Sequence, residues 1–312
     1  MSSGRSLLSV CVVVAGLASR VVWSQTPEPK SGLQLRAETT LVVIPVSVTD
    51  ASNRFVLGLQ KENFAISEDG VKQKIAQFSG EDAPLSAGLL VDTSGSMGMK
   101  LGRSRDAVAE FLKTMNPGDE AFLVTFSDKA ELQVPFTNDV GEIETRLASV
   151  ESEGLTALLD GVQVGLQAMK KAKNSRKALV IVSDGGDNNS QYTPQQIEDL
   201  VREADVQIYA MGVFEPSFLP ALSAAELSGP KLLSEITEQT GGRAFPARTN
   251  SALPSIARRI AIELRNQYVI AYTPTNRERN GKYRKVQVTV AAPQGLSALK
   301  VHWRLGYYAP AQ

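Results

Sequence analysis

The chain is poor in the residues that carry redox and nucleophilic chemistry. Its 312 residues include one cysteine, Cys11, and one histidine, His302. A single cysteine excludes a disulfide framework within the chain, and a single histidine leaves little scope for a hydrolase that needs a general base. Basic and acidic residues are equal in number, 33 of each. No strong field therefore favours nucleic acid or an anionic membrane surface, and we expect no nucleic-acid partner.

Long hydrophobic runs are also scarce, and the run near the N-terminus is short. Arg5 precedes the apolar stretch Leu7–Ala18, Arg20 follows it, and Val22 and Ser24 place compact or small side chains at positions −3 and −1 of a cleavage before Gln25. This pattern predicts a secretory signal peptide over residues 1–24. A short membrane anchor is the alternative, although the run is short for a span and is interrupted by arginine.

Cleavage after the predicted signal would change the chemistry of the mature chain. It would remove Cys11, and with it all thiol chemistry, and would leave a small acidic excess. Residues 25–38, which contain TPEPKSG, have the composition of a linker. We therefore expect an exported protein, periplasmic or extracellular, with no stable membrane span after cleavage.

Two segments with the periodicity of β-strands lie on either side of the central region. Residues 39–83 and 263–312 are both strand-like, and Asp69-Gly70 and Asn280-Gly281 supply the positive φ of tight turns. The alternating apolar residues of the first strand are Val42, Ile44, Val46 and Val48. About four strands before the centre and three after it approach the seven of a simple β-sandwich. We predict that the two flanks pair into one β-sandwich domain, with two unrelated appendages as the alternative.

Residues 84–262 alternate apolar runs of strand length with helical patterns. Runs such as LVIV are apolar at every position, which is typical of parallel strands that are buried on both faces. The pattern predicts an α/β domain with a doubly wound, mainly parallel sheet, in which ligands bind beyond the carboxyl ends of the strands. Helices are expected near residues 103–115, 142–150, 156–171, 194–204 and 232–240.

Oxygen-bearing side chains gather where these strands are expected to end. Asp92, Ser94 and Ser96 follow an apolar run, Thr156 precedes a helical pattern, and Asp184 follows LVIVS. Each has an ordinary explanation as a cap or a turn residue. Together they bring carboxylate and hydroxyl oxygens from three loops to one edge of the sheet, and hard cations such as Mg²⁺ prefer oxygen ligands.

This arrangement resembles the von Willebrand factor type A domain and its metal-ion-dependent adhesion site (MIDAS). The family pattern of DxSxS, then Thr, then Asp is filled here by Asp92, Ser94, Ser96, Thr156 and Asp184. The resemblance implies a bound Mg²⁺, or Mn²⁺ or Ca²⁺, and a protein or peptide partner whose acidic side chain completes the coordination. KENFAISEDG before this region and QYVIAYTP after it resemble an exported bacterial group of "VWFA-related" proteins.

Three features of the sequence extend or depart from that pattern. Many family members have Gly-Gly-Thr where this chain has Gly154-Leu155-Thr156, so a positive φ at Leu155 would strain the loop. The run from Asp187 to Asn189 offers oxygens to a second ion, or serves as an ordinary turn. The aromatic residues of the segment HWRLGYY either form a binding face or pack within a sheet.

Enzymatic interpretations compete with metal-dependent binding. A phosphatase of the haloacid dehalogenase type would use Asp92 as its nucleophile, but the general acid expected two residues later is Ser94. GSMGMK lacks the spacing of a phosphate-binding GxxxxGK[ST] loop, and His302 has no GxSxG motif to serve. We predict a non-enzymatic protein that binds a protein or peptide ligand through a divalent cation. A structural subunit of an envelope assembly with an incidental metal loop, and a metal-dependent phosphohydrolase, are the alternatives.

Overall fold

The computed structural model describes residues 41–214, 224–247, 249–293 and 298–311. The predicted signal peptide and linker lie outside these residues. In the described part of the chain, no helix is both long enough and apolar enough to cross a bilayer.

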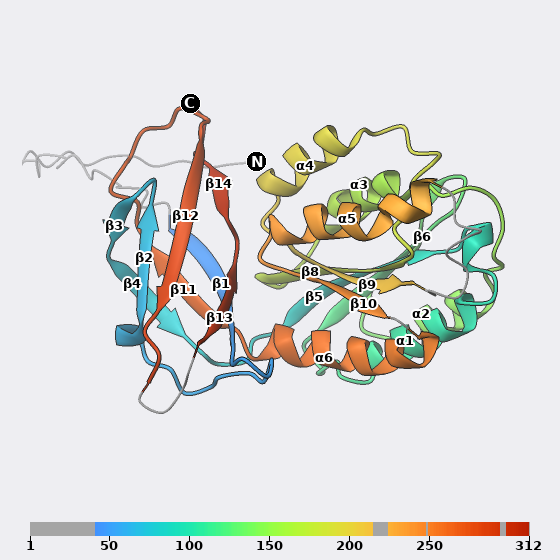
Figure 1. The fold of residues 1–312 in the computed structure, drawn as a ribbon, viewed down its shortest axis with the longest axis horizontal. Coiled ribbons are helices and arrows are strands. Elements are labelled where there is room, and N and C mark those ends of the chain that lie inside the picture. The colour runs from blue at the N-terminus through green and yellow to red at the C-terminus, as the bar shows by residue number, and fades with distance from the viewer. Residues whose placement is uncertain (1–40, 215–223, 248, 294–297, 312) are drawn as a thin grey trace, which may run out of the picture. The chain divides into compact units, whose positions relative to one another are not determined.

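A six-stranded sheet forms the core of the central region, in the order β10-β9-β8-β5-β6-β7 (Figure 1). Its strands are β5 (Leu85–Asp92), β6 (Glu120–Phe126), β7 (Ala130–Thr137), β8 (Arg176–Ser183), β9 (Gln207–Val213) and β10 (Ala244–Ala247). Neighbouring strands are parallel except for the antiparallel pair β6 and β7. Every residue of β5, β6 and β9 is buried, which explains why the middle of each strand is mainly apolar, without the alternation of a half-buried strand. The predicted doubly wound α/β fold is confirmed.

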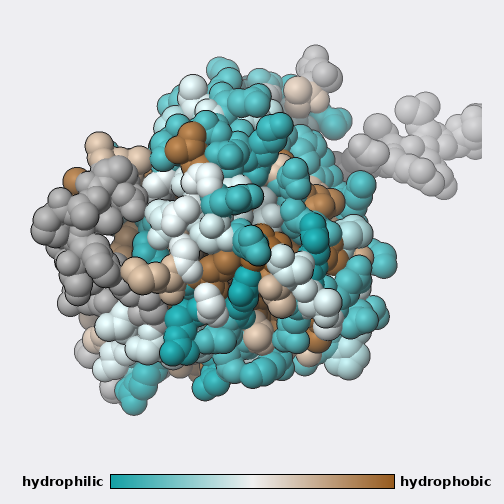
Figure 2. Space-filling model, turned by 90° about the vertical axis from the view of Figure 1, so that its right-hand side faces the viewer, coloured by the Kyte–Doolittle hydropathy of each residue, from teal (hydrophilic) through white to brown (hydrophobic). Residues whose placement is uncertain are grey.

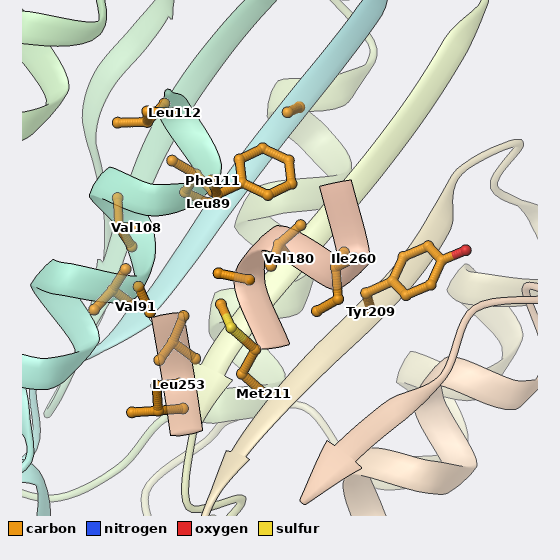
Figure 3. Packing of buried hydrophobic residues seen from close by; sticks show 14 of the residues in the cluster. Leu89, Val91, Val108, Phe111, Leu112, Val180, Tyr209, Met211, Leu253 and Ile260 are labelled. Carbon is orange, nitrogen blue, oxygen red and sulfur yellow. The ribbon is translucent and has the colours of Figure 1, made fainter. Parts of the chain in front are cut away.

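Helices cover both faces of this sheet. They are α1 (Leu101–Leu112), α2 (Val140–Ala148), α3 (Leu158–Met169), α4 (Pro194–Glu203), α5 (Ala224–Glu238) and α6 (Leu253–Arg265). Helices α1, α2 and α6 pack on one face, and α3, α4 and α5 pack on the other (Figure 1). Figure 3 shows the first core, in which Phe111 of α1 and Ile260 of α6 lie over Leu89 and Val180 of the central strands.

Some elements differ from the sequence prediction. Helix α5 begins at Ala224 rather than near residue 232, because it continues through Pro230. Strands β7 and β10 were not predicted, and neither was α6, which runs past the predicted domain boundary at residue 262. The remaining predicted helices are present, with ends shifted by a few residues, as is usual for boundaries read from sequence.

The two β flanks form two four-stranded antiparallel sheets. One sheet has the order β13-β1-β11-β4 and the other β14-β12-β2-β3. The strands of the first flank are β1 (Val42–Thr49), β2 (Phe64–Glu68), β3 (Val71–Gln73) and β4 (Ile75–Ser79); those of the second are β11 (Tyr268–Tyr272), β12 (Tyr283–Val290), β13 (Lys300–Trp303) and β14 (Gly306–Tyr308). Each sheet contains strands from both flanks, and one hydrophobic core joins the sheets. The flanks therefore pair into a β-sandwich, as the sequence predicts.

The connections of this sandwich depart from the predicted ones. The Asp69-Gly70 hairpin is confirmed, with φ values of 47° and 83° between β2 and β3. Gly281 also has a positive φ, 65°, but β11 and β12 belong to different sheets, so the turn there does not close a hairpin. The expected last strand is divided, because β13 pairs with β1 while β14 pairs with β12. The sandwich therefore has eight strands rather than the predicted seven, because the segment expected as one strand crosses from one sheet to the other.

A buried acid ties the start of the six-stranded unit to its end. Oδ1 of Asp119 accepts a hydrogen bond of 2.8 Å from the backbone N–H of Leu85, the first residue of β5. Oδ2 of the same carboxylate accepts one from the guanidinium of Arg265, the last residue of α6. The two ends of the unit therefore meet at one side chain.

Candidate functional site

The candidate site lies at the carboxyl end of the two central strands. Asp92 is the last residue of β5, and Asp184 directly follows β8. These strands are parallel neighbours with Val91 opposite Val182, so their ends lie side by side. The chain leaves β5 toward β6 on one side and reaches β8 later on the other, so this is the switch point where doubly wound folds bind ligands.

The loop after β5 turns its hydroxyl groups toward the loop after β8. The backbone N–H of Ser94 donates to Oδ1 of Asp92 at 2.9 Å, which starts the turn. The hydroxyl oxygens of Ser94 and Ser96 then lie 3.1 Å apart, and Ser96 donates to Oδ2 of Asp184 at 2.8 Å. Met97 is fully buried in the core below and anchors the loop. Four of the five predicted ligands are thus linked by hydrogen bonds.

Thr156 reaches the same place through its backbone. Its N–H donates to Oδ1 of Asn188 at 2.8 Å, and its carbonyl oxygen accepts from the N–H groups of Asn188 and Asn189. In the same loop, the carbonyl oxygen of Gly154 accepts a hydrogen bond of 3.0 Å from the N–H of Gly95. Within the described residues, no hydrogen bond joins the Thr156 hydroxyl to the other four ligands. The three loops are nevertheless tied to one another in pairs.

The structure decides two points about the Thr156 loop that the sequence left open. Thr156 does not cap a helix, because α3 begins at Leu158 with Ala157 as its N-cap residue. Leu155 is not strained, because the positive φ of 79° falls on Gly154. A Cβ at Gly154 would lie 2.7 Å from the carboxylate of Asp128, which accepts from the N–H of Leu155 at 2.7 Å. The loop therefore keeps one essential glycine, and the neighbouring position tolerates a side chain.

The residues proposed for a second ion are engaged elsewhere. Oδ1 of Asp187 accepts from the hydroxyl of Ser190 at 2.5 Å, and burial raises the pKa of this carboxyl. Asn188 orients Thr156, and Asn189 donates to the carbonyl of Asp128 at 2.8 Å. These contacts hold the three loops together, so the ordinary turn interpretation is the better one.

The electrostatics of the site are unbalanced. Asp92 and Asp184 are both buried, and the donors to Asp92 within the described residues are neutral: the N–H of Ser94 and the hydroxyl of Ser183, which lies 2.6 Å from Oδ2. Burial first, and the nearby charge of Asp184 second, raise the pKa of Asp92 to about 6. The ammonium of Lys100, 3.1 Å from Oδ2 of Asp184, is the cation within reach. Two buried acids thus share one lysine.

The donor set suits a hard divalent cation. Two carboxylates and the hydroxyls of Ser94 and Ser96 converge from two loops, and Thr156 lies on a third loop that is tied to both through its backbone. Oxygen ligands with few carboxylates fit Mg²⁺ or Mn²⁺, which keep part of their water shell. In the described part of the chain, no group of three or more His, Cys, Asp or Glu side chains could hold a metal ion. A site here would depend on hydroxyl groups as much as on acids.

The histidine and aromatic residues near the C-terminus pack within the sandwich. His302 lies on β13 opposite Ser47 of β1, in a different sheet from Asp92. The indole of Trp303 donates to the carbonyl of Val286 at 3.0 Å, and Tyr307 is buried in the sandwich core. These residues belong to packing, not to a separate binding face.

Sequence reasoning missed two residues that contact the predicted ligands. Ser183 bonds to Asp92, and Lys100 bonds to Asp184. The signal for Ser183 was present, since the residue that ends one buried strand lies beside the end of its neighbour. The contact of Lys100 depends on how its loop folds back over the sheet edge, and no spacing rule reveals it.

Comparisons with known proteins find similarity in the central part of the chain. A sequence profile of the von Willebrand factor type A domain matches residues 88–186. A protein of Borreliella burgdorferi is 27% identical over 183 residues, covering 51% of this chain and 53% of the relative. Human inter-alpha-trypsin inhibitor heavy chain H3 is 28% identical over 134 residues, covering 39% of this chain and 15% of that protein. The chain thus spans about half the length of the first relative and a small part of the second.

Solved structures share the fold. The von Willebrand factor type A protein from Catenulispora acidiphila has a TM-score of 0.50 and 13% identity, covering 90% of this chain and 76% of its own. Proximal thread matrix protein 1 from the mussel byssus, with a zinc-occupied MIDAS motif, also has a TM-score of 0.50, with 18% identity, and covers 64% of this chain and 50% of its own. At these identities the likeness concerns the fold alone.

Proposed function

Because this chain contains a von Willebrand factor type A domain, we propose that it binds a protein or peptide ligand through a divalent cation. The ion is Mg²⁺, or Mn²⁺ or Ca²⁺ in its place, and its ligands are Asp92, Ser94, Ser96, Thr156 and Asp184. The observation that carries the proposal is the hydrogen bond from the Ser96 hydroxyl to Asp184 across two loops, with the Ser94 hydroxyl 3.1 Å from that of Ser96. A turn that served only to reverse the chain would have no need of that contact.

The charge of the site supports an acidic partner. Hydroxyl ligands add no charge, so a dication held by two carboxylates keeps its attraction for an anionic oxygen. A carboxylate from the partner would fill the open position of the ion. Figure 2 shows the face toward which the parallel strands run, where hydrophilic residues predominate and hydrophobic ones show between them. Met99 and Leu155, 81% and 50% exposed, lie next to the predicted ligands in sequence and offer apolar contact beside the ion.

A metal titration tests the first half of the proposal. Mg²⁺ or Mn²⁺ at a hundred times its Kd should stabilise the chain by roughly 2.7 kcal/mol and raise its melting temperature. Asp92→Ala should remove the shift, and Asp106→Ala, which deletes an exposed acid of α1, should retain it. Equal shifts for wild type and Asp92→Ala would place the ion elsewhere or nowhere.

Chelation tests the second half. Partners captured by the mature chain from envelope and culture-medium fractions should be released by EDTA and retained when Mg²⁺ is restored. Ser96→Ala should weaken the same capture without unfolding the chain, because Ser96 is exposed at the mouth of the site. Capture that survives both treatments would favour a structural subunit whose metal loop is incidental.

We expect no phosphohydrolase activity from this site. The nucleophile of such an enzyme must reach its substrate, whereas Asp92 is fully buried and both of its oxygens accept hydrogen bonds, from Ser94 and Ser183. Turnover of a generic phosphate ester that is lost in Asp92→Asn would overturn this expectation.

Export is part of the same proposal, and N-terminal sequencing of the native protein should find a chain that begins near Gln25.

A further inference from the structure

Lys100 brings a cation of the protein's own into the candidate metal site. Its Nζ lies 3.1 Å from Oδ2 of Asp184, and its side chain is 13% exposed. The same carboxylate oxygen accepts the hydroxyl of Ser96 at 2.8 Å. The ammonium group therefore contacts a predicted metal ligand at the oxygen that already faces a second predicted ligand.

The side chain of Lys100 is not needed to start helix α1. The backbone N–H of Lys100 donates to the carbonyl of Met97 at 2.8 Å. Its own carbonyl accepts from the N–H and the hydroxyl of Ser104, at 3.0 and 3.2 Å. The main chain is thus fixed on both sides without the ammonium, and the turn of the side chain toward Asp184 is a separate feature.

An ammonium and a dication cannot both hold this oxygen at low energy. A metal ion would lie about 2.1 Å from a ligating carboxylate oxygen, and the lysine nitrogen would then be within a few ångströms of the ion. Repulsion between charges at such a distance is strong where water is largely excluded. The lysine stem is flexible, and part of it reaches solvent, so the ammonium has somewhere to go.

We infer that Lys100 is a built-in competitor of the metal ion: binding of a divalent cation displaces its ammonium from Asp184. The inference rests on the proposed function. In the metal-free protein the lysine offsets one of the two buried negative charges and keeps the loops assembled. The protein therefore binds metal more weakly than its oxygen ligands alone would allow. When the ion leaves, the ammonium of Lys100 returns to Asp184 and takes its place.

The test compares two charge-removing variants of the same helix region. Lys100→Met keeps an apolar stem and removes the ammonium. Arg103→Met removes an equal charge three residues later, from an exposed pair with Asp106. Isothermal titration of the metal-free chain with Mg²⁺ and Mn²⁺ should give Lys100→Met an affinity about tenfold higher than that of wild type, and Arg103→Met nearly the wild-type value. The melting temperature of the metal-free Lys100→Met protein should fall, and that of the metal-saturated protein should not.

The outcomes separate the inference from the function beneath it. If Lys100→Met binds no more tightly than Arg103→Met, or more weakly than wild type, Lys100 only supports the fold and the inference is overturned. If Lys100→Met does not fold, Lys100→Gln takes its place. Binding by Lys100→Met without binding by wild type supports the inference and overturns the proposed function of the native chain. Absence of binding in both overturns both.

Discussion

Two of the regions in which the molecule buries carboxylates treat them differently. In the β-sandwich, Oε2 of Glu68 accepts the hydroxyls of Tyr272 and Tyr307, both at 2.8 Å. Its Oε1 accepts from Arg284 at 3.2 Å, which neutralises the charge. Burial, and the hydrogen bonds to the carboxylate, raise the pKa of both tyrosines, so they remain donors at any ordinary pH. This network is complete without any ligand.

At the edge of the six-stranded sheet, the buried charges are not fully neutralised. Among the residues that the structure describes, Asp92 has only neutral donors and Asp184 has one lysine, so one of the two buried charges has no counter-ion there. A buried ion pair that is closed on itself serves the fold, whereas an excess charge at a sheet edge is suited to a cation from outside. The contrast separates a structural acid from a binding acid more clearly than burial does, since all three side chains are buried.

The largest effect is expected from breaking the closed network. Glu68→Ala would leave Arg284 buried without its counter-ion, and the loss of one partner of a buried pair costs about 3–5 kcal/mol. Urea denaturation should show that loss in the free energy of unfolding. Glu62→Ala removes an exposed acid of the same segment and should change the value by less than about 0.5 kcal/mol. A similar small change for Glu68→Ala would mean that the network adds little.

The open site should respond in the opposite way. Asp92→Asn removes one of two neighbouring buried charges, so in EDTA the free energy of unfolding should stay the same or rise by about 1 kcal/mol. In saturating Mg²⁺ the variant should lack the roughly 2.7 kcal/mol that a ligand at a hundred times its Kd provides. Denaturation of both proteins under both conditions measures the two quantities. A loss in EDTA as large as that of Glu68→Ala would remove the distinction between the two regions.

A third comparison concerns the backbone of the site. Gly154→Ala forces an L-residue to a φ of 79° and places a Cβ against Asp128, which should reduce stability by roughly 1–3 kcal/mol. Leu155→Gly acts at the next position, which is free of this strain, and should reduce stability by no more than about 1 kcal/mol. Thermal denaturation of the pair decides whether the loop depends on one glycine. Equal losses would show that Leu155 carries the constraint after all.

The smallest effect is a pH dependence that arises in the sandwich. Burial first, and then the charges of Arg243 and Lys300, lower the pKa of His302 to about 4. Between that value and its ordinary pKa of 6.5, the unfolded chain takes up a proton that the native protein does not, so stability falls as the pH drops through this window. The partial exposure of the ring reduces the expected contribution to about 1–2 kcal/mol. His302→Gln should flatten the stability profile between pH 7 and 5; an unchanged slope would assign it to other groups.

Much of the fold was predictable because its central strands are buried on both faces. The strands that were missed lack that signature: β7 lies at the sheet edge with only one of its eight residues, Val134, buried, and β10 has four residues including Pro246. Helix α6 does carry helical spacing, but the boundary predicted at residue 262 falls inside it. The division of the last strand between two sheets depends on tertiary packing, which periodicity does not report.

The candidate ligands were predictable for a different reason. Asp92 and Asp184 follow strands that are readable in the sequence, and a parallel sheet brings such ends to one edge. The contacts of Ser183 and Lys100 could not be found in that way, because they depend on which atom of a loop faces which carboxylate. The oxygen ligands at this edge of the sheet could be predicted from the sequence, whereas the balance of charge between the two acids and Lys100 could not.

The meeting of both ends of the six-stranded unit at Asp119 also bears on how the chain folds. Sandwich partners lie far apart along the chain; the N–H of Leu59 donates to the hydroxyl of Tyr268, 209 residues away. Contacts so distant are slow to form, and strands β1 and β4, whose partners β11 and β13 come late in the chain, would wait with their edges unpaired. Once the intervening unit has folded, Asp119 holds Leu85 beside Arg265, and the long search becomes a short loop closure. We therefore expect a sequential reaction in which the sandwich assembles last, and in which mutations at Asp119 slow its assembly more than they weaken either part.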